Sequence, residues 1–504
     1  MAAIETPEEK ALRLKNSGNE ALKICKYSEA ADLYTQALEL HETSVLFSNR
    51  AMSYIKMEQY GQAILDADCS IKIDPQYVKA YYRRGSANFA LGKNKAAKKD
   101  FKKVCQMKPK DRDARAKLAA CTKAVNEAAF AMAIESDETA PLSQTLDPGQ
   151  WAISAAYEGP HPGAGGVVLE DMDAEKMLFT PGMLPREFVM DAIQGFKDGK
   201  HIHKRYVARL LISCKEYFEG VSTLTEITVP DLGSDGTPET AHVTVCGDTH
   251  GQFYDVLNIF ELNGYPSASN PYLFNGDYVD RGSWGLEVVL TYFLLKISDP
   301  NCIFLTRGNH ETKNMNKIYG FEGEVKHKYD INIFNLFLEV FCWLPLAATI
   351  NNKVFVVHGG LSSEDSVTLS DIKALKRGIE PPEGGLFSDL LWSDPQPFPG
   401  KSPSKRGVGY SFGPDITAAF LDKNGLDLLV RSHEVKDEGY LVEHAGKCIT
   451  IFSAPNYCDS MGNKGAFIHF GHDLEPKFTQ YAHSPHPDVR PMAYAQGMGG
   501  LMGL

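Results

Sequence analysis

Six short clusters of His, Asp, Asn and Arg each follow directly after a short apolar run in the second half of the chain. The pairs, in chain order, are HVTVC with GDTHGQ, PYLF with NGDYVDRG, CIFLTR with GNHE, VFVV with HGG, LDLLV with RSHE, and CITIF with SAPNYC. Side chains that follow β-strands have rigid supports and converge at one edge of a sheet in α/β folds. Mixed His, Asp and Asn ligands suit Mn, Fe or Zn, whereas thiolates favour softer ions. The spacing therefore predicts a metal-binding and phosphate-binding site built from strand ends.

Other catalytic chemistries lack their motifs. Cys246 and Cys458 adjoin two of the clusters, but neither lies in the HCxxxxxR loop of cysteine phosphatases, so we expect all ten cysteines to be structural. The chain contains no GxxxxGK[ST] sequence, which excludes the phosphate loop of NTPases. A kinase or NTPase function is excluded with it.

In this order, the six clusters resemble the phosphoprotein phosphatase family of metal-dependent serine/threonine phosphatases over about residues 180–485. The resemblance implies an α/β domain with a central β-sandwich flanked by helices. Hydrolysis of a phosphate monoester is among the slowest reactions that enzymes accelerate, so it needs a strong nucleophile and neutralised phosphoryl charge. Two metals about 3.5 to 4 Å apart supply both, because a bridging water ionises near neutral pH and the ions clamp phosphate oxygens.

The resemblance also implies a role for each matching residue. The first metal takes Asp248, His250 and Asp277, and the second takes Asp277, Asn309, His358 and His433. His310 is the expected general acid, with Asp280 orienting its imidazole, because a neighbouring carboxylate keeps a histidine protonated near pH 7. The residues expected to bind the substrate phosphate are Arg281, Asn309, Arg406 and Tyr457. Arginine suits this task because its planar fork matches phosphate oxygens.

The first half of the chain repeats itself. Gly18, Ala51 and Gly85 are spaced by 33 and 34 residues, and small residues at fixed positions let paired helices approach closely. This region, residues 8–125, resembles three tetratricopeptide repeats, which form an all-α solenoid. Five polar residues of the first helices match the carboxylate clamp of such domains: Lys15, Asn19, Asn49, Lys79 and Arg83. That resemblance implies a partner, the C-terminal tail of heat-shock protein 90 family chaperones, held by charge-assisted hydrogen bonds.

Between the two halves, the pattern predicts a capping helix and linker over residues 126–180. Helical periodicity continues to about residue 134, and a Pro/Gly/Ser-rich stretch follows. Amphipathic segments at 185–200 and 205–220 predict helices that open the catalytic domain, residues 181–485. Residues 486–504 are assigned to a C-terminal regulatory tail. The predicted fold class is a multidomain chain in which the solenoid precedes the metallophosphatase domain.

Composition sets the class of protein and its compartment. The 504 residues are 43% hydrophobic and 23% charged, which excludes wholesale disorder and coiled coils. Scattered cysteines and the lack of a signal sequence or transmembrane run predict a cytoplasmic and nuclear protein. Residues 1–125 hold 23 Lys and Arg against 15 Asp and Glu, a net charge of +8 that leaves −20 for the rest. Charge alone permits nucleic acid or an acidic peptide as partner, and with the clamp we expect the peptide and no nucleic acid.

The expected function is hydrolysis of phosphoserine and phosphothreonine in phosphoproteins, with manganese the expected metal in vitro. In repeat-bearing phosphatases of this family the repeats fold over the catalytic cleft, which implies autoinhibition that chaperone binding relieves. Glu58 and Tyr319 match positions that stabilise the closed form. The alternatives are a catalytically weak scaffold recruited to chaperones and a nucleotide metallophosphoesterase. Intact ligands argue against the scaffold, and the KRGVGYSFG and SAPNYC segments weigh against the nucleotide enzyme.

Overall fold

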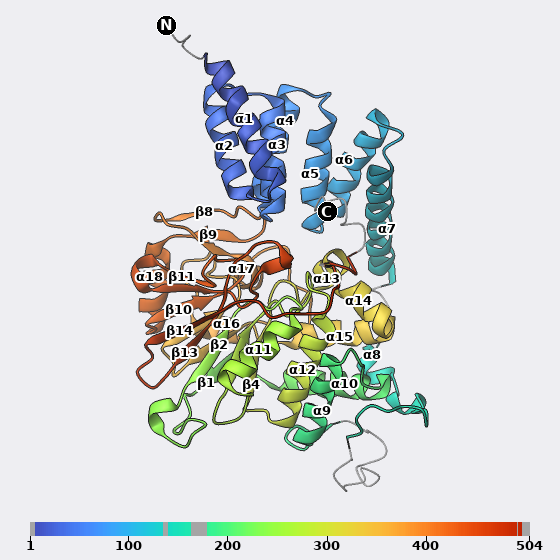
Figure 1. Cartoon of the computed structure of the whole chain (residues 1–504), viewed down its shortest axis with the longest axis vertical. Coiled ribbons are helices and arrows are strands. Elements are labelled where there is room, and N and C mark those ends of the chain that lie inside the picture. The colour runs from blue at the N-terminus through green and yellow to red at the C-terminus, as the bar shows by residue number, and fades with distance from the viewer. Residues whose placement is uncertain (1–5, 135–139, 163–178, 491, 496–504) are drawn as a thin grey trace. The chain divides into compact units, whose positions relative to one another are not determined.

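The structure is a computed structural model that describes residues 6–134, 140–162, 179–490 and 492–495. It divides into two units, one N-terminal to Ala140 and one that begins there (Figure 1). Residues 403–408 group with the N-terminal unit. No helix of the described segments is long and apolar enough to cross a membrane.

The N-terminal unit consists of helical hairpins, as the sequence period predicts. Its helices are α1 (Pro7–Lys23), α2 (Tyr27–Leu40), α3 (Ser44–Lys56), α4 (Tyr60–Ile73), α5 (Val78–Ala90), α6 (Asn94–Met107) and α7 (Arg112–Ile134). A capping box of Thr6 and Glu9 begins α1. Gly18 permits close packing, because a Cβ there would lie 2.7 Å from the ring of Tyr34. The predicted tetratricopeptide arrangement is confirmed.

The catalytic unit contains two sheets packed face to face. The strands of the first, in order across the sheet, are β1 (Leu224–Ile227), β5 (Ala347–Ile350), β6 (Val354–Val357), β10 (Leu428–Arg431), β12 (Cys448–Ile451) and β11 (Tyr440–Glu443). The second has β14 (Pro476–Tyr481), β13 (Gly465–Phe470), β2 (Val243–Cys246), β3 (Tyr272–Asn275) and β4 (Ile303–Thr306). A small third sheet joins β7 (Asp394–Pro395), β9 (Tyr410–Phe412) and β8 (Lys401–Pro403).

Helices cover the outer faces of this sandwich. They are α8 (Leu142–Thr145), α9 (Arg186–Lys197), α10 (Lys204–Gly220), α11 (Phe253–Asn263), α12 (Gly285–Ser298), α13 (Lys313–Tyr319), α14 (Phe321–Lys328), α15 (Ile331–Trp343), α16 (Leu369–Lys373), α17 (Leu386–Trp392) and α18 (Pro414–Asn424). Short 3-10 turns are η1 (Pro148–Gln150), η3 (Pro238–Thr240), η4 (His444–Gly446) and η5 (Tyr457–Asp459). The helices predicted at 185–200 and 205–220 are confirmed as α9 and α10.

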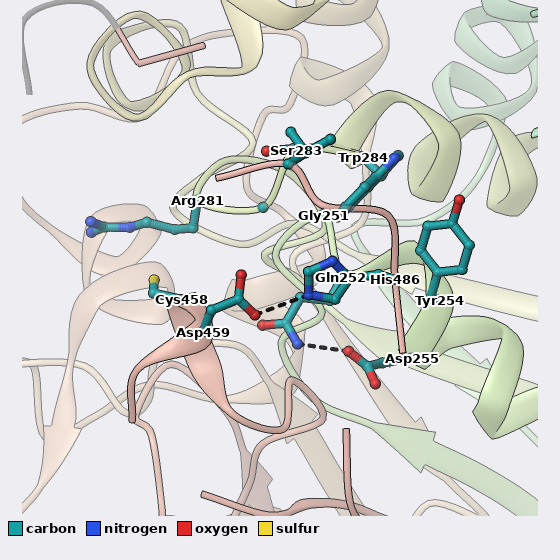
Figure 2. A pocket seen from close by; sticks show the side chains of 12 residues that line it. Gly251, Gln252, Tyr254, Asp255, Arg281, Ser283, Trp284, Cys458, Asp459 and His486 are labelled. Atoms are coloured by element: carbon teal, nitrogen blue, oxygen red, sulfur yellow. Dashed lines mark hydrogen bonds and ion pairs between the residues drawn. The ribbon is translucent and has the colours of Figure 1, made fainter. Parts of the chain in front are cut away.

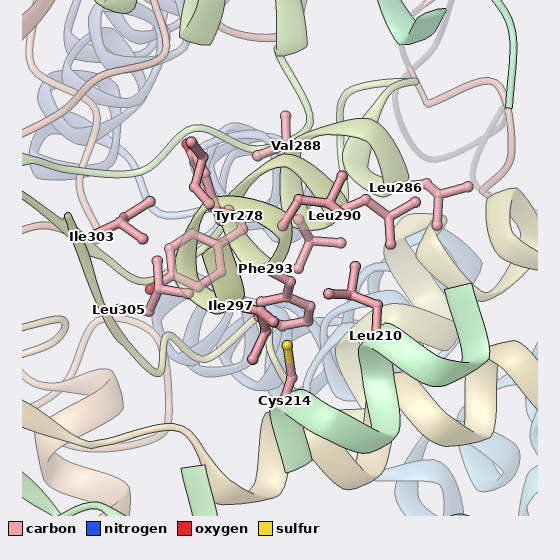
Figure 3. Packing of buried hydrophobic residues seen from close by; sticks show 14 of the residues in the cluster. Leu210, Cys214, Tyr278, Leu286, Val288, Leu290, Phe293, Ile297, Ile303 and Leu305 are labelled. Atoms are coloured by element: carbon pink, nitrogen blue, oxygen red, sulfur yellow. The ribbon is translucent and has the colours of Figure 1, made fainter. Parts of the chain in front are cut away.

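Strand side chains alternate between two layers of the core, as a two-residue period requires. In β6, Val354 and Val356 enter the core between the sheets, whereas Phe355 and Val357 face the layer that α16, α17 and α18 cover. A second helical layer packs on β2, β3 and β4, with Phe293, Ile297 and Leu210 among its buried side chains (Figure 3). The predicted α/β sandwich is confirmed, and its burial gives the strand ends a rigid base.

The structure places the join between the units differently from the predicted linker at 126–180. Residues 140–162 belong to the catalytic unit, where Leu142 N and Ser143 N donate to the Glu339 carboxylate at 2.7 and 3.2 Å. Lys204 Nζ lies 3.9 Å from the centroid of the Trp151 ring. These individual contacts order a stretch that lacks the apolar periodicity of a helix or strand. The capping helix is α7, whose side chains after residue 126 lie outside the described ones.

Candidate functional site

All six polar clusters begin where a buried strand ends. β2 ends one residue before Gly247, β3 before Gly276 and β6 before His358. Loops after β4, β10 and β12 carry the other three clusters. Because β2, β3 and β4 run parallel, as do β6, β10 and β12, their carboxyl ends lie on shared edges. The clusters thus follow strands of two different sheets, and contacts such as that of His358 Nε2 with Asp277 Oδ2 at 3.4 Å bring the two edges together.

The first group of candidate ligands surrounds His250. Its Nε2 atom lies 3.7 Å from Asp248 Oδ2 and 3.5 Å from Asp277 Oδ2. All three side chains are buried. The backbones of His250 and Asp277 have φ of 39° and 51°, left-handed values that non-glycine residues adopt mainly where the surroundings hold them. The loops therefore aim three ligand atoms at one small volume.

The second group shares Asp277 with the first. His358 Nε2 lies 3.4 Å from Asp277 Oδ2, 2.9 Å from Asn309 Oδ1 and 3.2 Å from His433 Nδ1. One oxygen of Asp277 is thus near histidine nitrogens on both sides. The distances suit a carboxylate that bridges two ions, as predicted for Asp277.

Hydrogen bonds fix the tautomers of two histidines. His250 Nδ1 donates to Val279 O at 3.1 Å, and His358 Nδ1 donates to Asn275 O at 2.8 Å. Each Nε2 is then the lone-pair nitrogen that metal binding requires. Burial, opposed by His358 and reinforced by Asp277, raises the pKa of Asp248 to about 8. Buried carboxylates that crowd lone-pair nitrogens fit a cation site, so the donor set suits the implied metals.

His310 departs from this ligand pattern. Atoms of His310, His250 and Asp277 lie near enough to hold an ion, yet His310 Nδ1 is bonded to Asp280 Oδ2 at 2.8 Å. Asp280 also accepts from Asn316 Nδ2 at 3.2 Å and Phe321 N at 2.9 Å. Burial raises the pKa of Asp280 to about 7, although these hydrogen bonds lower it. The bond from Nδ1 to Asp280 orients the imidazole of His310. The other ring nitrogen, Nε2, takes no part in that bond.

Arg281 adjoins the pair. Its guanidinium carbon lies 3.7 Å from the Tyr319 ring centroid, and the same ring lies 5.1 Å from that of His310. The ring of Tyr457 lies 5.1 Å from that of His250. Beside them is a pocket lined in part by Arg281, Ser283 and Trp284 (Figure 2). Arg406 lies in the segment that groups with the N-terminal unit, so its phosphate-binding role stays a prediction.

Glu311 is a site residue that sequence reasoning missed. Its carboxylate accepts from Asp277 N, Tyr278 N and Gly308 N at 2.8, 2.8 and 2.9 Å, which ties the β3 loop to the β4 loop. Burial raises its pKa to about 8. Its position in GNHE was a signal, because that glutamate adjoins His310.

The five clamp residues lie on the first helices of the hairpins: α1 carries Lys15 and Asn19, α3 carries Asn49, and α5 carries Lys79 and Arg83. Asn19 Oδ1 accepts from Tyr34 Oη at 2.7 Å and from Asn49 Nδ2 at 3.1 Å, which leaves the Asn19 NH₂ group as a donor. No carboxylate of the described segments shifts the pKa of Arg83, which burial lowers. Lys56 is a neighbouring cation that sequence reasoning missed. Burial and, to a smaller extent, the charge of Arg83 lower the pKa of Lys56 to about 8.

The two residues predicted to stabilise a closed form lie in different units. Glu58 follows α3 with a φ of 61°. Tyr319 ends α13 and is 2% exposed within the catalytic unit. Of the predicted tail, residues 486–490 and 492–495 are described, whereas 491 and 496–504 lie outside the described residues.

Comparison with known proteins adds family evidence. Residues 241–437 match the calcineurin-like phosphoesterase family, 118–226 match the PPP5 TPR repeat region, and 78–111 match the tetratricopeptide repeat. Serine/threonine-protein phosphatase 5 of Homo sapiens is 49% identical over 97% of this chain and 95% of its own length. Serine/threonine-protein phosphatase T of Trypanosoma brucei brucei is 48% identical over 97% of this chain and 99% of its own length. A solved protein serine/threonine phosphatase from Saccharomyces cerevisiae, titled as similar to human phosphatase PP5, is 46% identical, with a TM-score of 0.58 over 62% of this chain and 100% of that one.

Proposed function

The chain belongs to the serine/threonine-protein phosphatase 5 family, and on that basis we propose how its residues divide the catalytic work. It is a metal-dependent protein serine/threonine phosphatase with tetratricopeptide repeats. We assign Asp248, His250 and Asp277 to one metal ion. Asp277 is shared with a second ion, which Asn309, His358 and His433 complete. The observation that carries this assignment is Asp277 Oδ2 lying 3.5 and 3.4 Å from His250 Nε2 and His358 Nε2.

Divalent ions bound there supply charge neutralisation at the phosphoryl group and an activated water. His310 then protonates the departing seryl or threonyl oxygen through Nε2, while Asp280 holds the imidazole by Nδ1 and stabilises its charged form. Arg281, Asn309, Arg406 and Tyr457 bind and orient the phosphate. We propose manganese, iron or zinc as the ions, with manganese preferred in vitro, because the donors are imidazole, carboxylate and amide oxygen.

Phosphoproteins are the proposed substrates, and the tail of a heat-shock protein 90 family chaperone is the proposed partner of the helical unit. Lys15, Lys79 and Arg83 supply cations, and Asn19 and Asn49 supply amide donors, for a terminal carboxylate and an acidic side chain. Among the described residues no carboxylate shifts the pKa of Arg83, and this supports the proposal, since a buried guanidinium without an acidic partner gains most from an incoming carboxylate. A cytoplasmic and nuclear location, without a nucleic-acid partner, accords with these roles.

The proposed regulation is autoinhibition by the repeats and the C-terminal tail, with Glu58 and Tyr319 stabilising the closed form. The opposite net charges of the two halves favour their association. A chaperone tail relieves the restraint only if it binds the open state more tightly, at ~1.4 kcal/mol for each tenfold activation.

A peptide ending in Met-Glu-Glu-Val-Asp tests this regulation in the full chain. We expect it to raise turnover of a phosphoserine peptide, and Arg83→Ala to abolish the response while basal turnover stays unchanged. Lys102→Ala, which removes an exposed cation from α6, is the matched control and should respond as the wild type does. Glu58→Ala should raise basal turnover. Activation of Arg83→Ala to the wild-type extent would refute the clamp.

A further inference from the structure

The chain after β14 crosses the surface of the catalytic unit as a segment without helix or strand. We name residues 482–490 and 492–495 the C-terminal strap. Ser484 N donates to Asp255 Oδ1 at 2.7 Å near its start. Further along, His486 Nε2 is bonded to Asp459 Oδ1 at 3.1 Å, and its ring lies 5.1 Å from that of Trp284 (Figure 2). The strap is therefore attached along its length.

Two of its contacts reach the loop that carries Arg281. Met492 N donates to Arg281 O at 2.9 Å, and Ser283 Oγ donates to Arg490 O at 3.1 Å. On the opposite side of the same residue, Arg281 N donates to Tyr319 O at 3.2 Å. Both peptide groups of Arg281 are thus fixed, one by the end of α13 and one by the strap.

The Arg281 loop needs such support because its backbone is strained. Asp280 and Arg281 have φ of 68° and 71°, values that non-glycine residues retain only when neighbouring structure determines them. A Cβ at Gly282 would lie 2.3 Å from His250 O, so the loop also packs closely against the backbone of His250, a proposed metal ligand. A shift of this loop would move the guanidinium of Arg281 and the carboxylate of Asp280 together.

The end of the strap packs closely against α14, where the backbone of Tyr494 approaches that of Gly323. A Cβ added at Gly323 would lie 2.3 Å from Tyr494 O. The Tyr494 ring lies 5.4 Å from that of His327 and 5.8 Å from Lys328 Nζ. Lys328 is held in turn by Glu287 and Glu324 at 2.6 and 2.7 Å. Glycine at 323 is what lets Tyr494 reach this anchored surface.

We propose that Met492 and Tyr494 are positioning residues for Arg281, and that the strap sets the geometry with which the enzyme grips the phosphoryl group. The inference rests on the phosphate-binding role proposed above for Arg281. Loss of the hydrogen bond from Met492 N, or of the packing of Tyr494 on α14, removes the restraint on the carbonyl group of Arg281. The guanidinium then samples orientations that do not match the phosphate oxygens, and small misplacements of this kind are costly to catalysis.

Gly323→Ala tests the proposal in the full chain. The residue lies within α14, where alanine is a better helix former, so the steric conflict with Tyr494 O is the main disturbance. We expect the inhibition constant of inorganic phosphate and the KM for a phosphoserine peptide each to rise about tenfold. Metal content should equal that of the wild type. Gly195→Ala in α9 is the matched control, because its Cβ would meet only Lys200 Cβ at 3.9 Å, and it should leave both constants unchanged.

A double-mutant cycle separates positioning from a general structural effect. In an Arg281→Ala background, adding Gly323→Ala should change the phosphate inhibition constant less than twofold. A tenfold rise of the phosphate inhibition constant in both backgrounds would overturn the proposal. Higher turnover with an unchanged inhibition constant would overturn it too. If Gly323→Ala unfolds, Ser283→Ala, which removes the donor to Arg490 O, must show the same effect at smaller size. Wild-type phosphate inhibition in Arg281→Ala itself would instead refute the role of Arg281 on which the inference rests.

Discussion

His310 is held on both its ring and its main chain. His310 Nδ1 bonds to Asp280, and His310 N donates to Asp277 Oδ1 at 2.8 Å. The proposed acid is therefore oriented relative to Asp277, the carboxylate that both groups of candidate ligands share. A side chain placed in this way can deliver its proton without a search through rotamers.

We predict that His310→Asn lowers kcat on a phosphoserine peptide by about 10² to 10⁴-fold, the usual loss for a general acid or base. Asparagine cannot protonate the leaving oxygen, but it leaves Asp248, Asp277 and the other ligands in place. Metal analysis should find the wild-type content. The loss should shrink on an aryl phosphate, whose leaving group needs no proton. An equal loss on both substrates would exclude the acid role.

A second histidine gives a pH signature remote from the site. The ring of His469 in β13 packs against that of His242 at a tilt of 39°, with ring centroids 4.0 Å apart. Burial, followed by the charges of His242 and Lys477, lowers the pKa of His469 from 6.5 to about 4. The unfolded chain then binds this proton more tightly than the folded one. The stabilisation is present above pH 6.5 and is lost as the pH falls through about 4.

We therefore predict that His469→Gln flattens the acid side of the stability profile. Glutamine retains a donor toward Asn263 Oδ1, which His469 Nε2 contacts at 2.9 Å, and it does not titrate. Calorimetry between pH 7 and 4 should show a smaller fall in Tm for the variant than for the wild type. Parallel Tm curves would contradict the lowered pKa.

The motifs identified the candidate ligand residues, because each motif fixes residue type and spacing. They did not identify Glu311 as the acceptor that joins two loops, or Arg431, whose buried guanidinium bonds to Gly359 O and Asp394 at 2.7 and 2.8 Å. Such roles depend on which loops meet in space, and a linear pattern does not contain that information.

At the scale of elements, the repeat period predicted the hairpins and their small packing residues. It did not predict the ion pairs inside them. Arg50 binds Asp66 in a bidentate pair at 2.8 Å, and Arg84 binds Asp100 at 2.9 and 2.7 Å. Arg50 and Arg84 are separated by one repeat, and so are Asp66 and Asp100, so the signal was present in the sequence. The sandwich's strand order, in contrast, arises from long-range pairings such as that of β6 with β10.

Packing within the hairpins predicts a graded response to alanine. Gly18→Ala should destabilise the helical unit by about 1 to 3 kcal/mol, because its Cβ would lie 2.7 Å from the buried Tyr34 ring. Gly85→Ala should be nearly neutral, since contacts of 3.2 and 3.3 Å with Asp100 and Phe101 offset a helix-propensity gain of about 1 kcal/mol. Urea unfolding followed by circular dichroism measures both. Equal losses would show that hairpin spacing does not govern this unit's stability.

At the scale of the whole molecule, charge and motif placement predicted two domains but not where the catalytic unit begins. Five apolar residues of 140–162 pack against its core: Leu142, Leu146, Trp151, Ile153 and Tyr157. They are irregularly spaced, so no helical or strand period marked them. Their burial depends on contacts with α10 and α15, which lie far along the chain.

Truncation should reveal this packing. We predict that a chain of residues 180–504 unfolds at a lower temperature than one of residues 140–504, with a stability loss of about 3 to 5 kcal/mol, because the shorter chain lacks these five side chains and exposes the core surface that they cover. Calorimetry of the two fragments measures the difference. The same Tm for both would mean that residues 140–162 add nothing to the catalytic unit.

The role proposed for Asp277 is to bridge two metal ions that phosphoserine hydrolysis requires. Its most direct test measures bound metal and turnover together for full-length Asp277→Asn, with Asp473→Asn as the exposed control. Loss of the shared carboxylate leaves the histidine nitrogens without their common partner, so both ions should bind more weakly. We predict fewer than two bound ions and no measurable turnover in Asp277→Asn, cooperative unfolding in both variants, and wild-type values for the control. Two bound ions with wild-type turnover in Asp277→Asn would contradict the bridging role of Asp277.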